Sequence, residues 1–174
     1  MKKMKRLLAL TLVLLLGVAT FLPATNVEAA KKLSTTKVRQ IVRKNTPALK
    51  NRTLYIESDY DDGILVYEVE GSTASRHYTF EVNAYSGRIL EKSWEARGTI
   101  KKGTKNLTTK EARDKISKEV VAKKYQTYYR IRTDYEDGVK IYEVDVNSKN
   151  KRYEMEINAT TGKFIEVSWE VRNK

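Results

Sequence analysis

A thirteen-residue segment occurs twice in this chain with few changes. NAYSGRILEKSWE occupies residues 83–95 and NATTGKFIEVSWE occupies residues 158–170, so one fixed offset carries Asn83 onto Asn158. The preceding segments repeat at the same offset, with YDDGILVYEVEG at 60–71 and YEDGVKIYEVDV at 135–146. A repeat of this length indicates one supersecondary unit that is present twice. Any fold assigned to the chain must therefore be built from two similar halves.

Each copy is expected to begin with a helix. In the second copy, Thr108 and Glu111 have the spacing of a capping box, and apolar residues follow at helical spacing. In the first copy, Ser34 takes the place of the capping threonine, while Lys37 replaces the glutamate. Pro47 predicts that the first helix ends at about residues 45–46, because the residue before proline avoids helical geometry.

Four strands are expected after each helix. Asp62-Gly63 and its counterpart at 137–138 are strong hairpin signals. Along the next strand, Tyr67 and Val69 alternate with glutamates, which gives the sheet one apolar and one polar face. The predicted fold class is α+β, with two repeats of one helix packed on a four-stranded antiparallel meander. The expected domains are a signal peptide over 1–29, a first repeat over 33–97, a linker over 98–106 and a second repeat over 107–172.

The N-terminal residues have the pattern of an export signal. MKKMKR precedes a long apolar segment, Pro23 interrupts it, and small or apolar residues lead to Ala29. We expect cleavage there and a secreted or extracytoplasmic location, with an uncleaved N-terminal membrane anchor as the alternative. The chain contains 0 cysteines, so disulfides and a lipid-bearing cysteine are both excluded.

The composition is strongly basic. The 34 lysines and arginines exceed the 22 acidic residues, for a net charge of +12. Such a surface attracts anionic partners, such as a membrane surface or a wall polymer, although solubility alone is a sufficient explanation. Nucleic acid is not an expected partner for an exported chain.

Few residues suggest chemistry. His77 is the single histidine and lacks an obvious set of partner ligands. The acidic residues at 59–62 are explained by the hairpin turn and do not have the spacing of a calcium loop. The strand glutamates, Glu68, Glu81 and Glu91 among them, are expected to pair across strands with lysine or arginine. We therefore predict no catalytic, metal or cofactor site, and no enzymatic activity.

The two tryptophans are the candidate partner-binding residues. Trp94 and Trp169 both belong to a repeated Ser-Trp-Glu that ends each copy. Tryptophan is enriched at binding hot spots because it offers a large and stiff surface. The alternative is that each tryptophan closes the end of its own core. The replacement of Val167 by Lys92 at equivalent positions indicates that this stripe is not uniformly buried.

The motifs in this order resemble a PepSY domain, present twice. The resemblance rests on Tyr-Glu-Val-Glu at 67–70 and Asn-Ala-Tyr-Ser-Gly at 83–87, and on their counterparts at 142–145 and 158–162. The chain has Asn83 and Asn158 where the family commonly has aspartate, and the Ser-Trp-Glu ending is not part of the family pattern.

The resemblance implies a non-catalytic protein, because PepSY domains occur in propeptides of secreted metallopeptidases and in envelope proteins and restrain peptidases locally. It therefore predicts an exported binding protein that inhibits or modulates a secreted peptidase at the cell envelope. The alternative is a cationic structural adaptor bound to the cell wall or a membrane surface.

Overall fold

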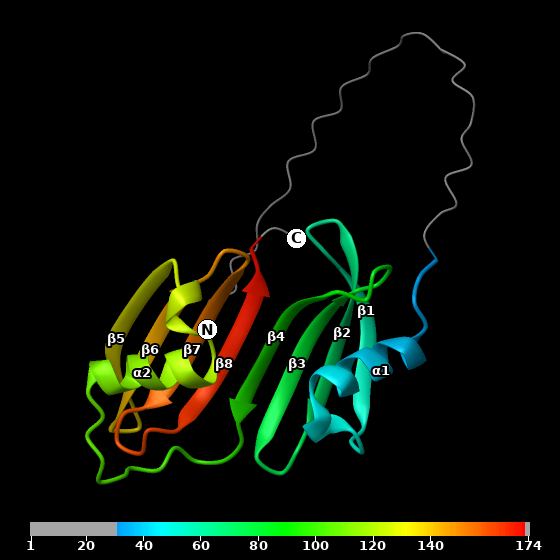
Figure 1. Cartoon of the computed structure of the whole chain (residues 1–174). Coiled ribbons are helices and arrows are strands. Elements are labelled where there is room, and N and C mark those ends of the chain that lie inside the picture. Colours follow the sequence, from blue (N-terminus) through cyan, green and yellow to red (C-terminus); the bar gives the residue numbers. More distant parts are fainter. Residues whose placement is uncertain (1–30, 173–174) are drawn as a thin grey trace, which may run out of the picture.

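The computed structural model describes residues 31–172, so the predicted signal peptide over 1–29 lies outside the described residues (Figure 1). Two units follow one another along the chain. Repeat 1 contains α1 (Thr35–Asn45), η1 (Pro47–Leu49), β1 (Leu54–Asp61), β2 (Ile64–Ser72), β3 (Arg76–Asn83) and β4 (Ile89–Ala96). Repeat 2 contains α2 (Thr109–Glu119), η2 (Lys123–Tyr125), β5 (Tyr128–Glu136), β6 (Val139–Asn147), β7 (Lys151–Asn158) and β8 (Phe164–Val171).

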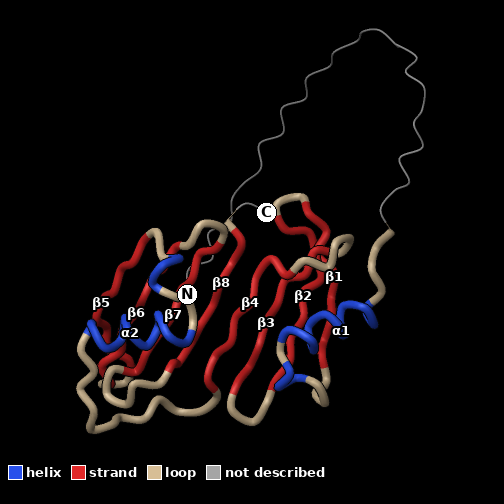
Figure 2. Tube along the Cα trace, viewed as in Figure 1, coloured by secondary structure: helices blue, strands red, loops and turns tan. Residues whose placement is uncertain are grey.

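The two meanders form one continuous sheet. Its eight strands have the order β1-β2-β3-β4-β8-β7-β6-β5, and every neighbouring pair is antiparallel. The last strands of the two repeats, β4 and β8, pair with each other, and we call this pair the seam. Both helices lie on the same face of the sheet (Figures 1 and 2). The predicted α+β fold is confirmed, whereas the joining of the two meanders was not predicted.

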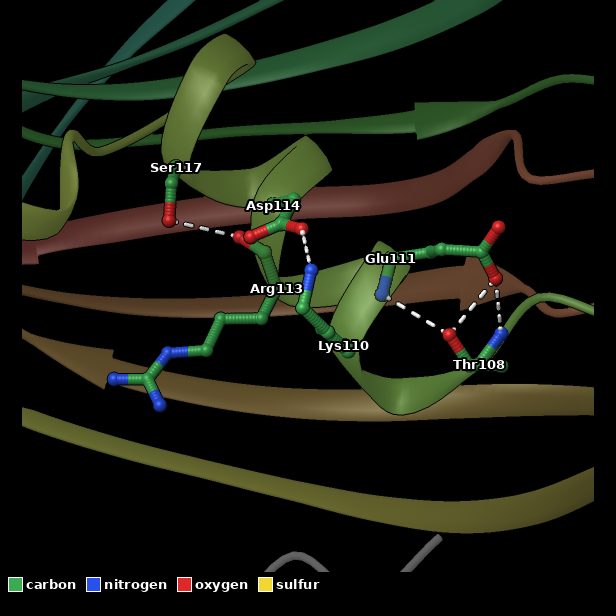
Figure 3. Close-up of polar contacts among 6 residues, drawn as sticks. All are labelled: Thr108, Lys110, Glu111, Arg113, Asp114 and Ser117. Atoms are coloured by element: carbon green, nitrogen blue, oxygen red, sulfur yellow. Dashed lines mark hydrogen bonds and ion pairs between the residues drawn. The ribbon is translucent and has the colours of Figure 1, made fainter.

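The helix boundaries follow the sequence signals. At the start of α2, Thr108 Oγ1 accepts a hydrogen bond from the Glu111 backbone N–H (3.2 Å), and the Glu111 carboxylate accepts one from the Thr108 backbone N–H (2.8 Å) (Figure 3). Farther along α2, Lys110 pairs with Asp114 at 3.1 Å. In α1, Ser34 alone supplies the cap, and the helix ends at Asn45 before the proline. The predicted capping box and proline stop are both confirmed.

The Asp-Gly hairpins adopt the backbone that their sequence requires. Asp62 and Gly63 have φ angles of 48° and 78°, and Asp137 and Gly138 have 50° and 73°. Two consecutive residues with positive φ define the hairpin turn whose twist matches that of the flanking strands. The turn prediction is therefore correct in both repeats.

Each helix packs on its own sheet half over a separate apolar core. In repeat 1, Val38 and Val42 of α1 are fully buried against β2 and β3, and Ala112 and Ile116 of α2 are their counterparts in repeat 2. A tyrosine on the second strand of each repeat fixes the segment that leads into the helix. The Tyr67 hydroxyl donates to the Leu33 carbonyl (2.6 Å), and the equivalent Tyr142 hydroxyl donates to the Leu107 carbonyl (2.7 Å).

The connection between the repeats has no helix or strand and is held against the β7–β8 turn. The Gly103 backbone N–H donates to Thr160 Oγ1 (2.8 Å), and the Lys105 backbone N–H donates to the Thr160 carbonyl (2.9 Å). The Asn158 side-chain amide donates to the Lys101 carbonyl (2.9 Å). The linker is thus part of the packed structure of repeat 2. None of the helices within residues 31–172 has the length and apolar character needed to cross a bilayer.

Candidate functional site

An approximate two-fold axis runs through the seam and relates β4 of repeat 1 to β8 of repeat 2. Ser93 lies directly opposite Ser168, the residue at its own equivalent position in the other repeat. On one side of this pair Trp94 faces Val167, and on the other side Lys92 faces Trp169. Because antiparallel partners share a face, all four of these side chains lie on the helix-bearing face of the sheet.

The two candidate tryptophans therefore come together, although they belong to different repeats and lie far apart in the sequence. Trp94 is opposite the buried Tyr78 on β3, and Trp169 is opposite Tyr153 on β7. Both indole rings are partly buried. The structure thus places Trp94 and Trp169 diagonally across the seam on one surface, between the two helices.

A cation covers each indole. The Arg76 guanidinium carbon lies 3.7 Å from the centre of the Trp94 ring, and the Lys151 ammonium lies 3.0 Å from that of Trp169. Arg76 and Lys151 begin β3 and β7 and are themselves equivalent at the repeat offset. Contacts of this kind are attractive because the ring face carries negative charge. Neither cation was predicted from the sequence as a site residue, although their shared offset and strand alternation place them beside the tryptophans.

These side chains line a cavity of about 380 Å³, which we call the junction groove. Its lining comes from both repeats: Arg76, Lys92, Trp94, Glu119, Val120, Lys151, Tyr153, Phe164, Val167 and Trp169. A second, more apolar hollow of about 710 Å³ lies beside it and shares Val120, Lys151 and Tyr153 with it. We call this neighbour the apolar shelf. The shared lining makes the two hollows neighbours at the end of α2.

The junction groove is electrostatically positive. The Lys92 ammonium donates to Thr46 Oγ1 at 2.8 Å, and burial, together with nearby Arg76, lowers the pKa of Lys92. Burial, followed by the charge of Lys92, also lowers the pKa of Lys151. Among the described residues of the lining, Glu119 is the one acidic side chain, and it already pairs with Lys115 at 2.6 Å. Positive charge in this groove is therefore largely uncompensated by its own lining.

The two tryptophans differ in their contacts with the hydrophobic cores of the repeats. Trp94 packs against the cores of both repeats and meets Phe164 edge-on, with 6.4 Å between ring centres. Trp169 is absent from the described side chains that pack against the core of either repeat. The core interpretation therefore applies to Trp94, which closes both cores and not its own alone. Partner binding by Trp94 and Trp169 stays a prediction.

The opposite face of the sheet carries glutamates in register. In one row, five of them lie side by side across β1, β2, β3, β4 and β8: Glu57, Glu68, Glu81, Glu91 and Glu170. The two-fold axis generates a second row, in which Glu95, Glu166, Glu156 and Glu143 are neighbours. Burial and adjacent carboxylates raise the pKa of Glu68, Glu156 and Glu166. This open face is acidic even though the chain as a whole is basic.

The predicted cross-strand pairing of acidic residues with basic ones is seen in repeat 2. Basic partners occur in repeat 2, where Arg130 pairs with Asp145 (2.8 Å) and Arg132 with Glu143 (3.1 Å). In repeat 1 the register sets Glu57, Glu68, Glu81 and Glu91 in one row, each opposite the next. The repeats differ because Arg132 occupies the position that is Glu57 in repeat 1.

Glu166→Gln is expected to stabilise the protein at neutral pH by about 0.5–1 kcal/mol, because it removes a charge that faces two other carboxylates. The pKa of Glu166 is raised in the folded state. The stability that the protonated Glu166 side chain contributes is therefore fully present below the pKa of the unfolded chain, and it is lost as pH rises through the pKa of the folded protein. The gain should therefore shrink near pH 4.5. Urea unfolding at pH 7 and at pH 4.5 measures the gain in stability.

Glu143→Gln, which breaks an ion pair with Arg132, is the matched control and should give no gain in stability. A lower stability of Glu166→Gln at pH 7 would contradict the expectation.

The remaining sequence candidates have structural partners. His77 Nδ1 lies 2.9 Å from Ser72 Oγ, and the residue opposite His77 is Glu95. The acidic residues at 59–62 form the tip of the β1–β2 hairpin, as predicted. Within residues 31–172, no group of three or more His, Asp or Glu side chains is arranged to hold a metal ion.

Comparisons with solved structures give two matches of low similarity. A candidate lipoprotein from Clostridium difficile 630 has 17% identity and a TM-score of 0.35, with 80% of this chain and 94% of that chain covered. The YpeB C-terminal domain of Bacillus megaterium has 13% identity and a TM-score of 0.32, with 82% and 100% covered. No curated protein sequence is significantly similar to the chain.

A family profile matches the chain twice, over residues 32–92 and 106–168. Its description is "Peptidase propeptide and YPEB domain". Both matches stop short of the tryptophan that ends each repeat, so the seam tryptophans lie outside the matched residues. The two matches together span more than half of the chain and fall on the two structural repeats, and the chain therefore belongs to the PepSY family.

Proposed function

We propose that this chain is an exported, non-catalytic binding protein that inhibits or modulates a secreted peptidase at the cell envelope. Its family is linked to peptidase propeptides, and its N-terminal residues have the pattern of an export signal. The observation that carries the proposal is the junction groove. Two PepSY units of one chain contribute equivalent tryptophans, each under a cation, to one surface hollow.

The geometry favours contact with a protein segment. Tryptophan and arginine are the side chains most often found at binding hot spots, and hot spots lie in hollows that exclude water. Here both residue types line one hollow of about 380 Å³ on a rigid sheet. A segment of the peptidase that inserts between the helices would contact both repeats at once, so binding would depend on the intact tandem.

Replacing Trp169 with serine is expected to weaken peptidase binding by roughly 30-fold or more, since a hot-spot tryptophan contributes about 2 kcal/mol or more. Trp169 is chosen because it packs against neither core within the described residues, so the fold should persist. The purified protein and the variant are titrated against the peptidases secreted by the native host, with inhibition and complex formation as readouts.

Tyr60→Ser is the matched control for that experiment. Tyr60 is 68% exposed on the edge strand β1, far from the seam in strand order. It should leave binding unchanged. If Tyr60→Ser weakens binding and Trp169→Ser does not, the partner uses the sheet edge and the groove assignment is wrong. An absence of both inhibition and complex with every secreted peptidase contradicts the proposed function itself.

A second candidate function is a cationic adaptor bound to an anionic wall polymer or membrane surface. The separation of charge between the two sheet faces favours it, because cations gather around the groove while glutamate rows occupy the open face. Sedimentation with purified walls at rising salt tests it. Retention that falls steeply with salt supports the adaptor, since screening weakens contacts between exposed charges.

A further inference from the structure

The charges around the junction groove restrict what can enter it. Arg76, Lys92 and Lys151 line it, and its single carboxylate, Glu119, is engaged by Lys115. Three cations held close together repel one another unless an anion lies among them. A group that carries negative charge is therefore favoured, and a basic segment is excluded.

The surroundings of these charges restrict the occupant further. The same hollow is lined by two indoles, Phe164 and Val167, and it shares Val120 and Tyr153 with the lining of the neighbouring apolar shelf. Lys124, Lys149 and Lys151 also border the shelf, and none of the described residues that line it is acidic. An occupant that suits both hollows has a carboxylate next to apolar side chains. A highly charged polymer without apolar groups would leave the shelf empty.

We propose that the junction groove receives a carboxylate side chain of an acidic, apolar peptide segment, held by Arg76, Lys92 and Lys151 while a neighbouring apolar side chain occupies the shelf. This inference rests on the proposed function, because it names the kind of peptidase segment that the groove would bind. The tryptophans then form the walls of the site, and the cations above them supply its polarity.

The chain itself provides the signal for a test. It contains two tryptophans in all, and both line the groove, so intrinsic tryptophan fluorescence reports on this site. The probe is a blocked pentapeptide with the sequence Gly-Leu-Glu-Leu-Gly. Saturable change in fluorescence is expected, and the Gln counterpart should bind at least about tenfold more weakly, because a hydrogen bond to a charged group is stronger than one to a neutral group. Equal binding of the two peptides overturns the proposal.

The double variant Lys92→Met/Lys151→Met removes two cations and keeps the apolar part of each side chain. Affinity for the acidic peptide, measured by calorimetry, should fall about tenfold or more. Both lysines have lowered pKa values, so their charged forms are disfavoured by the fold and the variant should remain folded. Lys118→Met, an exposed lysine of α2 outside the groove lining, is the control and should bind as the parent does. Unchanged affinity in the double variant overturns the proposal.

Two further measurements separate the alternatives. Short-chain polyphosphate should bind more weakly than the peptide, because it leaves the shelf unfilled; equal or tighter binding overturns the assignment to a peptide. Peptidase inhibition by the double variant distinguishes the two proposals. If inhibition persists while the parent protein fails to bind the acidic peptide, the groove inference is wrong and the proposed function stands. If the peptide binds but no peptidase is inhibited, the groove inference stands without that function.

Discussion

Phe80→Ala is expected to lower the free energy of unfolding by about 3–5 kcal/mol, the usual cost of deleting a fully buried phenylalanine. Phe80 is 1% exposed at the centre of the repeat 1 core. Its ring stacks with Tyr78 at 6.5 Å between centres, and the Lys92 ammonium lies 5.6 Å above it. Since domains are stable by about 5–15 kcal/mol, the loss is a large share of the total. Urea unfolding followed by circular dichroism measures it.

Met155→Ala is the matched variant, because Met155 occupies the equivalent position in repeat 2 and is 3% exposed. The expected loss is about 2–5 kcal/mol. Since the seam makes one sheet of the two repeats, and Trp94 packs against both cores, each variant should shift one shared transition. Two separate transitions, of which each variant moves only one, would show that the repeats unfold independently.

Asn158→Asp is expected to destabilise the protein by about 2–4 kcal/mol at pH 7, because it buries a charge and removes a hydrogen-bond donor. Asn158 is 3% exposed. Its side-chain oxygen accepts from the backbone N–H groups of Thr160 and Thr161, both at 2.9 Å, and its amide donates to the Lys101 carbonyl. A carboxylate would keep the first two contacts, but its negative charge would face the partial negative charge of the Lys101 carbonyl oxygen. Thermal unfolding at pH 7 measures the effect, which should lessen at acidic pH when the introduced group is protonated.

Asn83→Asp is the control in the other repeat. Asn83 is only partly buried, and its side-chain oxygen accepts from the backbone N–H groups of Tyr85 (3.1 Å) and Ser86 (2.8 Å). A carboxylate accepts the same bonds, so the change should alter stability by no more than about 0.5 kcal/mol. Equal losses at the two positions would contradict the role given to the linker contact. The contact with Lys101 also gives a physical reason for asparagine at position 158.

The local features of the fold could be predicted from the sequence because each depends on neighbouring residues. The capping box at Thr108 and Glu111, the proline stop and the Asp-Gly turns involve residues within four positions of one another. Strand alternation likewise assigned Tyr67 and Val69 to the apolar face. These signals occur twice in the sequence at one fixed offset, so each copy supports the interpretation of the other.

The seam and the candidate site could not be predicted in the same way. No sequence signal within either repeat predicts that β4 and β8 pair with each other, or that Ser93 lies opposite Ser168. The pairing of β4 with β8 fixes which side chains are neighbours across the two repeats. It sets Trp169 opposite Lys92, and it continues a row of glutamates from Glu91 to Glu170. The exchange of Lys92 and Val167 between repeats was the one local sign of a surface that is not simply core.

The antiparallel seam also has a consequence for the history and assembly of such units. In a single repeat, β4 would be an edge strand with unpaired backbone groups, open to association with a second molecule. The approximate two-fold axis at Ser93 and Ser168 is the symmetry of a homodimer formed through that edge. In the tandem chain the linker supplies the second strand at a high effective concentration, so the pairing no longer depends on how much protein is present. At high dilution the tandem chain thereby keeps a two-subunit surface that separate subunits would lose.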